Sequence, residues 1–240
     1  MPFSRLFSET TVYEALPDYV KKAEVTVFPC LSAFVGGDVV AGACAVFSGR
    51  EAGTSLLVDL GTNGELLLFV KGKLYGTAAA MGSAFEGGRY AYASDLFRLI
   101  ADALDAGIID ETGLLCEPYF TEGFSGLLQE DIREFQLAKG ALRAGIELLC
   151  RYAGVRLSEV ERVFLAGGFG RYCREEDMFS AGLLPVEFVG KVTIVGNSCI
   201  GGILSCFSEK KTMLYCEGEV LNLAEQPEFE ELFYRCMNFE

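Results

Sequence analysis

Short apolar runs, separated by turns that carry glycine, divide this chain into strands and helices. Runs that alternate, or that are continuously apolar for five or six residues, are typical of strands. The expected strands cover residues 24–29, 55–59, 65–70, 74–79, 162–166 and 192–195, with a late pair between residues 212 and 223. Because only short turns separate the three runs from 55 to 79, they predict a β-meander.

Helical runs alternate with the later strands. In the longest, predicted at residues 129–153, Ile132, Leu142 and Ile146 belong to a set of apolar residues that recur at three- and four-residue steps. The other helices are expected at residues 38–47, 94–106, 175–181 and 198–207 and after Pro227.

This order of elements predicts an α/β fold of the ribonuclease-H type, with a mixed sheet flanked by helices. We see no internal repeat and no clear linker. Residues 1–240 are therefore expected to form a single lobe, in which residues 1–23 are an irregular N-terminal segment or a remnant.

The acidic balance of the chain argues against nucleic acid as a partner. Acidic residues outnumber basic ones, 34 to 20, and the formal net charge is −14, whereas phosphate contacts need clustered Lys and Arg. No signal peptide and no apolar run long enough to span a membrane is visible. We therefore expect a cytoplasmic protein that needs no membrane.

Histidine is absent from the 240 residues, which excludes Ser-His-Asp, Cys-His and His-ligated metal chemistry within the chain. Nine cysteines are present, an odd number, and no two form a C-x-x-C pair. Such close pairs usually fix iron–sulfur and zinc sites. The cysteines are thus expected to be small buried hydrophobic residues in a reducing compartment.

The first glycine-bearing turn, DLGTNGE at residues 59–65, has the composition of a phosphate loop. Gly61 and Gly64 let the backbone approach a phosphate, and Thr62 and Asn63 add side-chain donors. Asp59 is the candidate catalytic residue, holding Mg²⁺ through water or orienting an attacking water. An ordinary hairpin turn is the alternative, because Asn-Gly is a common hairpin dipeptide.

Two more glycine-bearing turns follow predicted strands. Gly167, Gly168 and Gly170 form a ledge almost free of side chains that suits an adenosine, or else simply a strand-to-helix connection. The third turn, residues 196–198, leads into small residues that favour close helix packing. Because ligands bind beyond the carboxyl ends of strands in open α/β sheets, the three turns are expected to converge on one crevice.

Lys139 and Arg143 are four residues apart on the longest helix and share a face. They are candidates for contacts with the ribose or a phosphate of a nucleotide. A solvated helix face is the alternative interpretation.

Taken together, ordered segments of the chain resemble the C-terminal ATPase domain of the reductive activators of corrinoid proteins. This family lies in the actin, sugar-kinase and heat-shock-chaperone superfamily. The matching stretches are FPCLSAFVGGD (28–38), LLVDLGTNGE (56–65), AFEG (84–87), AGIIDETG (106–113), DIREFQLAKGALRAGIE (131–147), FLAGGFG (164–170), AGLLP (181–185) and VGN (195–197).

The resemblance implies that ATP or ADP with Mg²⁺ binds here, and that ATP drives the return of cob(II)amide to cob(I)amide in a corrinoid protein. Under it, residues 59–64 form the second phosphate motif, and Gly167, Gly168 and Gly170 belong to the adenosine motif. Such activators also carry a 2Fe–2S ferredoxin domain and a first ATPase lobe.

Neither of those parts is recognisable in this chain, so we expect no iron–sulfur cluster in it and an incomplete ATPase. A ferredoxin domain and a first lobe are expected in a longer chain. One alternative is a non-catalytic module that docks a corrinoid protein or forms a homodimer. Another is a sugar or acetate kinase, although no segment specific to those substrates is visible.

Overall fold

The computed structural model describes residues 28–47, 53–61, 63–82, 93–116, 126–167, 173–208 and 218–239. Its helices are α2 (Gly37–Phe47), α3 (Ala93–Asp105), α4 (Gln129–Tyr152), α5 (Glu175–Ser180), α6 (Ser198–Ser208) and α7 (Phe229–Met237). Its strands are β1 (Thr54–Leu60), β2 (Asn63–Val70), β3 (Lys73–Ala80), β4 (Arg162–Ala166), β5 (Val192–Gly196) and β6 (Gly218–Val220).

These strands form one sheet in the order β5-β4-β1-β2-β3-β6. The predicted meander is present, since β2 pairs antiparallel with both β1 and β3. The strands β1, β4 and β5 are mutually parallel, so their carboxyl ends reach the same edge of the sheet. The mixed sheet confirms the predicted fold class.

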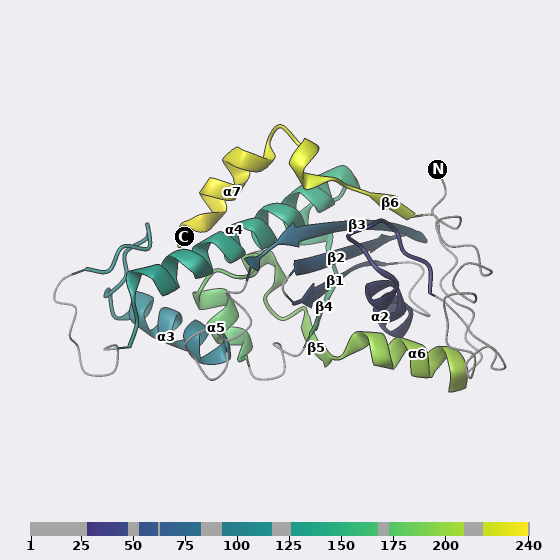
Figure 1. Cartoon of the computed structure of the whole chain (residues 1–240), viewed down its shortest axis with the longest axis horizontal. Coiled ribbons are helices and arrows are strands. Elements are labelled where there is room, and N and C mark those ends of the chain that lie inside the picture. Colours follow the sequence, from purple (N-terminus) through teal and green to yellow (C-terminus); the bar gives the residue numbers. More distant parts are fainter. Residues whose placement is uncertain are drawn as a thin grey trace, which may run out of the picture.

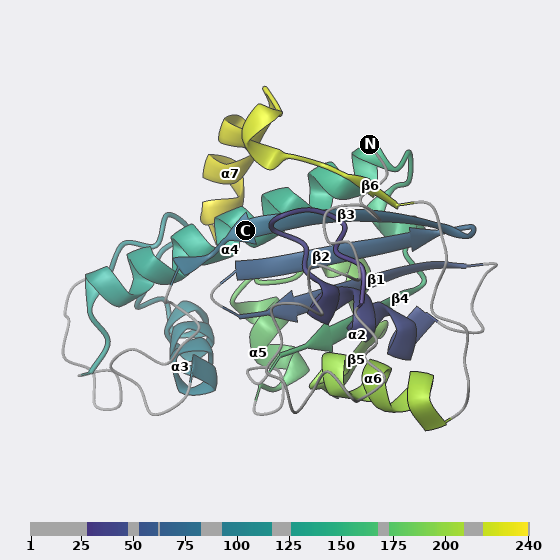
Figure 2. The same ribbon diagram turned by 45° about the vertical axis from the view of Figure 1, so that its right-hand side comes forward.

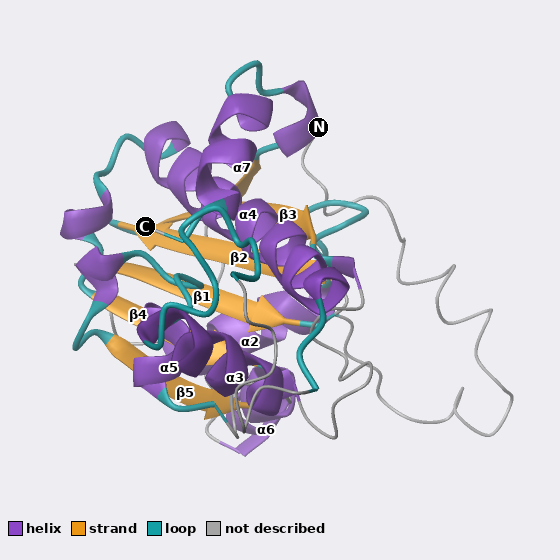
Figure 3. Cartoon of the chain, turned by 90° about the vertical axis from the view of Figure 1, so that its left-hand side faces the viewer, coloured by secondary structure: helices purple, strands orange, loops and turns teal. Residues whose placement is uncertain are grey.

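Helices cover both faces of the sheet, and the alternation of side chains along each strand explains why (Figures 1 and 3). On β1, Leu56 and Val58 point into a core shared with α3, α4 and α5. Leu57 points to the opposite face, into a smaller core with Phe47 of α2 and Phe164 of β4. A central strand with both faces covered is apolar throughout, as its sequence indicates.

On the second face, α2 and α6 lie side by side, as Figures 1 and 2 both show. Their backbones approach closely because small residues meet. A Cβ on Gly202 would overlap the carbonyl oxygen of Ala41, and one on Gly42 would overlap the hydroxyl of Ser198. The close packing expected for the glycine-rich helix is confirmed.

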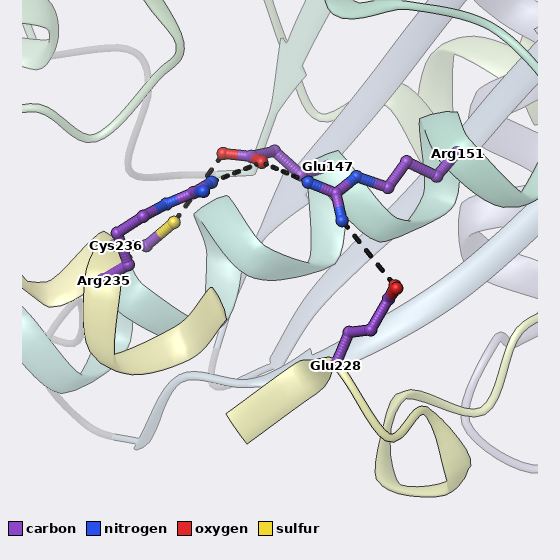
Figure 4. Close-up of polar contacts among 5 residues, drawn as sticks. All are labelled: Glu147, Arg151, Glu228, Arg235 and Cys236. Atoms are coloured by element: carbon purple, nitrogen blue, oxygen red, sulfur yellow. Dashed lines mark hydrogen bonds and ion pairs between the residues drawn. The ribbon is translucent and has the colours of Figure 1, made fainter. Parts of the chain in front are cut away.

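The C-terminal helix α7 packs along α4, on the same side of the molecule as β6 (Figure 1). At Gly140 a Cβ would lie 3.0 Å from the carbonyl oxygen of Phe233, so glycine permits this approach as well. Polar contacts reinforce the pair, because the carboxylate of Glu147 on α4 accepts a hydrogen bond of 2.8 Å from Arg235 on α7 (Figure 4).

Most predicted elements coincide with observed ones within one or two residues. Of the late pair of strands, the described part contains the short strand β6, while residues 212–217 lie outside it. The expected strand at residues 24–29 lies mostly outside the described residues, as does the whole segment 1–23. Within the described parts, no helix has the length and apolar character that crossing a membrane requires.

Candidate functional site

The turn between β1 and β2 places two carboxylates side by side. Asp59 near the end of β1 and Glu65 near the start of β2 are direct partners in the antiparallel register. The turn is tight, because the N–H of Gly61 donates a hydrogen bond of 3.0 Å to the carbonyl oxygen of Asn63. Gly64 is buried against Met81, and Thr62 lies outside the described residues.

Gly167 directly follows β4 and contacts the ends of the two neighbouring strands, β5 and β1. Its φ of +98° lies in the left-handed region, which favours glycine. Its N–H donates a hydrogen bond of 3.0 Å to the carbonyl oxygen of Gly196 on β5, and a Cβ would overlap the carbonyl oxygen of Leu60 on β1. Gly168 and Gly170 lie outside the described residues, so their predicted role remains a prediction.

A cavity of about 260 Å³ lies where these three strand ends meet. The residues that line it come from α2, the β1–β2 turn, the β4 end and the start of α6: Asp38, Val39, Asp59, Gly61, Glu65, Gly167, Asn197 and Cys199. The three glycine-bearing turns thus converge on one crevice, as the sequence predicts. Asp59, Gly61 and Gly167 are the predicted site residues that the structure brings together there.

Asp59 and Glu65 are destabilised in their charged form. Burial raises the pKa of Asp59, while the hydroxyl of Ser198, which donates to Oδ2 at 3.3 Å, lowers it. Burial, and then the charge of Asp59, raises the pKa of Glu65 to about 7. A cation or a hydrogen-bond donor placed in the crevice would relieve this repulsion.

The arrangement fits Mg²⁺ held largely by water and phosphate. Among the described residues, no three His, Cys, Asp or Glu side chains are close enough to hold a metal ion by themselves. Mg²⁺ does not need such a cage, because it usually binds through one or two carboxylates, several waters and substrate phosphates. Asp59, with Glu65 beside it, offers such a minimal set of carboxylates.

Five residues of the crevice were not predicted as site residues. Asp38 lies in the first turn of α2, and its carboxylate accepts a hydrogen bond of 2.9 Å from the N–H of its neighbour Val39. Asn197 was assigned to packing, and its side chain accepts from the N–H of Ile200 at the start of α6. Val39, Glu65 and Cys199 complete the set. Two of these residues could have been identified from their position in the sequence, because Asp38 and Asn197 lie where apolar, glycine-containing helices begin.

Lys139 and Arg143 line a different cavity, of about 230 Å³, between α4, α7 and the turn after α5. Lys139 is buried, and its ammonium group donates to the carbonyl oxygens of Met237 and Asn238. This cavity shares no lining residue with the crevice at Asp59. The proposed contact of Lys139 and Arg143 with a nucleotide therefore remains a prediction.

The profile of a protein family described as the C-terminal domain of RACo, the ASKHA domain, matches residues 53–95 and 125–240. The chain belongs to this family. The match includes β1 to β6 and the helices α4 to α7, and with them Asp59, Glu65 and Gly167 of the crevice. The resemblance inferred from the ordered motifs is confirmed.

Two individual proteins are also similar to this chain. The corrinoid activation enzyme RamQ of Eubacterium limosum is 28% identical, over 88% of this chain and 47% of the relative. A solved structure of a reductive activator for corrinoid, iron–sulfur protein superposes with a TM-score of 0.76 at 25% identity, over 88% of this chain and 44% of that protein. The chain thus spans less than half the length of each of these relatives.

Proposed function

We propose that this chain is the nucleotide-binding lobe of an ATP-dependent reductive activator of corrinoid proteins. The observation that carries the proposal is the convergence of the β1–β2 turn, Gly167 and the start of α6 on one crevice with two raised-pKa carboxylates. Membership of the RACo C-terminal family supports the same assignment.

In this proposal the phosphates of ATP or ADP lie against the backbone of the turn that begins at Gly61. Glycine leaves the amide groups accessible there, and the N-terminus of α6 adds a favourable partial positive charge. Asp59 holds Mg²⁺ through water, and Glu65 beside it balances the charge of the ion. We assign contact with the adenosine to Gly167, Gly168 and Gly170. When bound, Mg²⁺ neutralises the charge that develops on the transferred phosphate.

The volume of the crevice supports a shared rather than a self-sufficient site. Its 260 Å³ lies just below the usual range of about 300–1,000 Å³ for pockets that enclose a whole ligand. We infer that a first ATPase lobe supplies the opposite wall. A ferredoxin domain would supply one electron, and a corrinoid protein would accept it as cob(II)amide becomes cob(I)amide.

Calorimetry with Mg²⁺ and ADP tests the binding part of the proposal. The expected result is binding that Asp59→Asn weakens at least tenfold, because the variant cannot carry the charge that holds the metal. Asp105→Asn is the matched control, since Asp105 is exposed at the end of α3 and distant from the crevice residues in the sequence. Absence of binding even when a separate first lobe is supplied would rule the proposal out.

The activation step is tested with a first lobe, a ferredoxin domain, a low-potential reductant and a corrinoid protein present together. The cob(II)amide and cob(I)amide states differ in their visible absorption, so the reduction can be followed directly. We expect ATP-dependent formation of cob(I)amide that is lost in Asp59→Asn. Formation at the same rate without ATP would contradict the proposed role of this lobe.

A further inference from the structure

The second cavity, between α4 and α7, is lined mostly by charged and polar groups. Lys139, Arg143 and Glu147 come from α4, Arg235, Cys236 and Asn238 come from the C-terminal segment, and Gly182 comes from the turn after α5. Three of these side chains are basic and one is acidic. In a chain with a formal net charge of −14, such a basic cavity is a local exception.

Arg143 is the lining residue whose hydrogen-bond donors are not all satisfied by the protein. One terminal nitrogen of its guanidinium donates to the carbonyl oxygens of Gly182 at 3.0 Å and Leu184 at 3.4 Å. Its Nε is buried and has no hydrogen-bond partner, and no other buried side-chain nitrogen or oxygen in the described part of the chain is left in this state. A buried donor without an acceptor is costly, so the guanidinium of Arg143, a residue that lines the cavity, is only partly satisfied by the protein.

Arg235 extends the basic surface from the opposite helix. One nitrogen of its guanidinium donates to Glu147 at 2.8 Å (Figure 4). The same carboxylate accepts a longer contact of 3.5 Å from Arg151, which also pairs with Glu228 at 3.6 Å. Glu147 therefore already balances two arginines, and it leaves the cavity as a whole with an excess of positive charge.

We propose that this cavity binds a small oxyanion of the phosphate class, independently of the nucleotide crevice. Two guanidinium groups on facing helices offer the planar donor geometry that phosphate oxygens accept. Lys139, which is buried and lines the same cavity, adds a further positive charge. The bound oxyanion joins α4 to α7 and so stabilises the docking of the C-terminal helix.

Inorganic phosphate is the probe, titrated into the full chain at constant ionic strength with chloride as the competing salt. Binding is followed by calorimetry and by the increase in the melting temperature. Arg235→Gln is expected to weaken phosphate binding about tenfold, because one charge-assisted donor is lost. Glu147→Gln is expected to tighten it several-fold, because the variant removes the one negative charge that lines the cavity while it retains an oxygen that can accept from Arg235.

Arg156→Gln is the matched control, since Arg156 is exposed and pairs with Glu159 away from this cavity. It should bind phosphate as the parent chain does. Circular dichroism of each variant checks that a loss of binding is not a loss of folding. The opposite signs expected for Arg235→Gln and Glu147→Gln separate an anion site from a purely structural ion pair, for which both variants would only lower stability.

Three results would overturn the proposal. The first is that phosphate shows no binding at millimolar concentration. The second is that phosphate binds equally to the parent chain, Arg235→Gln and Glu147→Gln. The third is displacement of the Arg235-sensitive phosphate by saturating ADP with Mg²⁺, which would mean that the two cavities serve one ligand. None of the phosphate titrations depends on nucleotide binding, so the proposed ATPase role can fail while this site stands.

Discussion

The hydroxyl of Ser198 donates a hydrogen bond of 3.3 Å to Oδ2 of Asp59, although 139 residues separate them in the chain. This contact links the start of α6 to the end of β1. It also connects the helix packing with the chemistry of the crevice, because Ser198 lies where a side chain on Gly42 of α2 would have to go. The position of α6 therefore influences the carboxylate that we propose to hold Mg²⁺.

Ser198→Ala tests this link through pH. Burial raises the pKa of Asp59 and the Ser198 hydrogen bond opposes that rise, so the variant should raise the pKa further. Wherever Asp59 titrates, a larger share of it is then protonated at a given pH and cannot hold a cation. Calorimetry of Mg²⁺–ADP binding from pH 5 to 8 should show the variant's affinity curve displaced to higher pH. Ser205→Ala, on the same helix, should leave the curve in place.

The stability of the chain should depend on pH through Glu65, because the pKa of this residue is raised from 4.5 to about 7 in the folded state. The folded state then binds more protons than the unfolded state between these values. The stability that comes from the protonated carboxyl is complete below about pH 4.5 and is lost as the pH rises through 7.

Glu65→Gln removes this titration while keeping the shape of the neutral side chain. We expect the variant and the parent chain to unfold at similar urea concentrations at pH 5. At pH 8 the variant should unfold at a higher urea concentration than the parent. Glu134→Gln, at an exposed position on α4, serves as the comparison and should show no such change with pH. Equal differences at both pH values would contradict the raised pKa.

The contact between α2 and α6 should tolerate no side chain at Gly202. A Cβ there would overlap the carbonyl oxygen of Ala41, so Gly202→Ala must push the helices apart. We expect it to lower the free energy of unfolding by about 2–3 kcal/mol, in the upper part of the range for overpacking. Chemical denaturation measures the change. Nucleotide affinity should fall with it, because the start of α6 brings Asn197 and Cys199 to the crevice.

Gly201→Ala is the internal control for this prediction. A Cβ on Gly201 would lie 3.7 Å from the Cβ of Ala45, an ordinary contact. Because alanine favours a helix over glycine, this variant should be unchanged or more stable by up to about 1 kcal/mol. If both variants destabilise the chain equally, close approach of the helices is not the reason for the glycines.

The rate at which Cys199 is alkylated can show whether the crevice is occupied, since this residue lines it. Burial, and then the charges of Asp38 and Asp59, raise its pKa, so alkylation should be slower than for a free thiol. Saturating ADP with Mg²⁺ should slow it further by covering the crevice. Peptide mapping by mass spectrometry follows the modification. Cys150, whose pKa burial raises to about 12, should stay unmodified in the folded chain with or without nucleotide.

Much of the fold could be predicted because each local signal agreed with the tertiary arrangement. Continuous apolar runs such as residues 55–59 became central strands, and the periodic run of residues 129–153 became α4. The crevice was also predictable in outline, since parallel strands end at the same edge of a sheet. Asp59, Gly61 and Gly167 were found in this way. Asp38 and Asn197 were not, because each lies at the start of an apolar helix, where a polar residue is ordinary.

The sequence by itself therefore determined the elements, the sheet class, the meeting of the glycine-bearing turns and, through the order of its motifs, the family. Only the tertiary structure decided what Lys139 and Arg143 face. Their spacing of four residues places them on one face of α4, yet spacing says nothing of which element covers that face. The packing of α7, set by contacts such as Gly140 with Phe233, surrounds them with the C-terminal segment rather than with the crevice at Asp59.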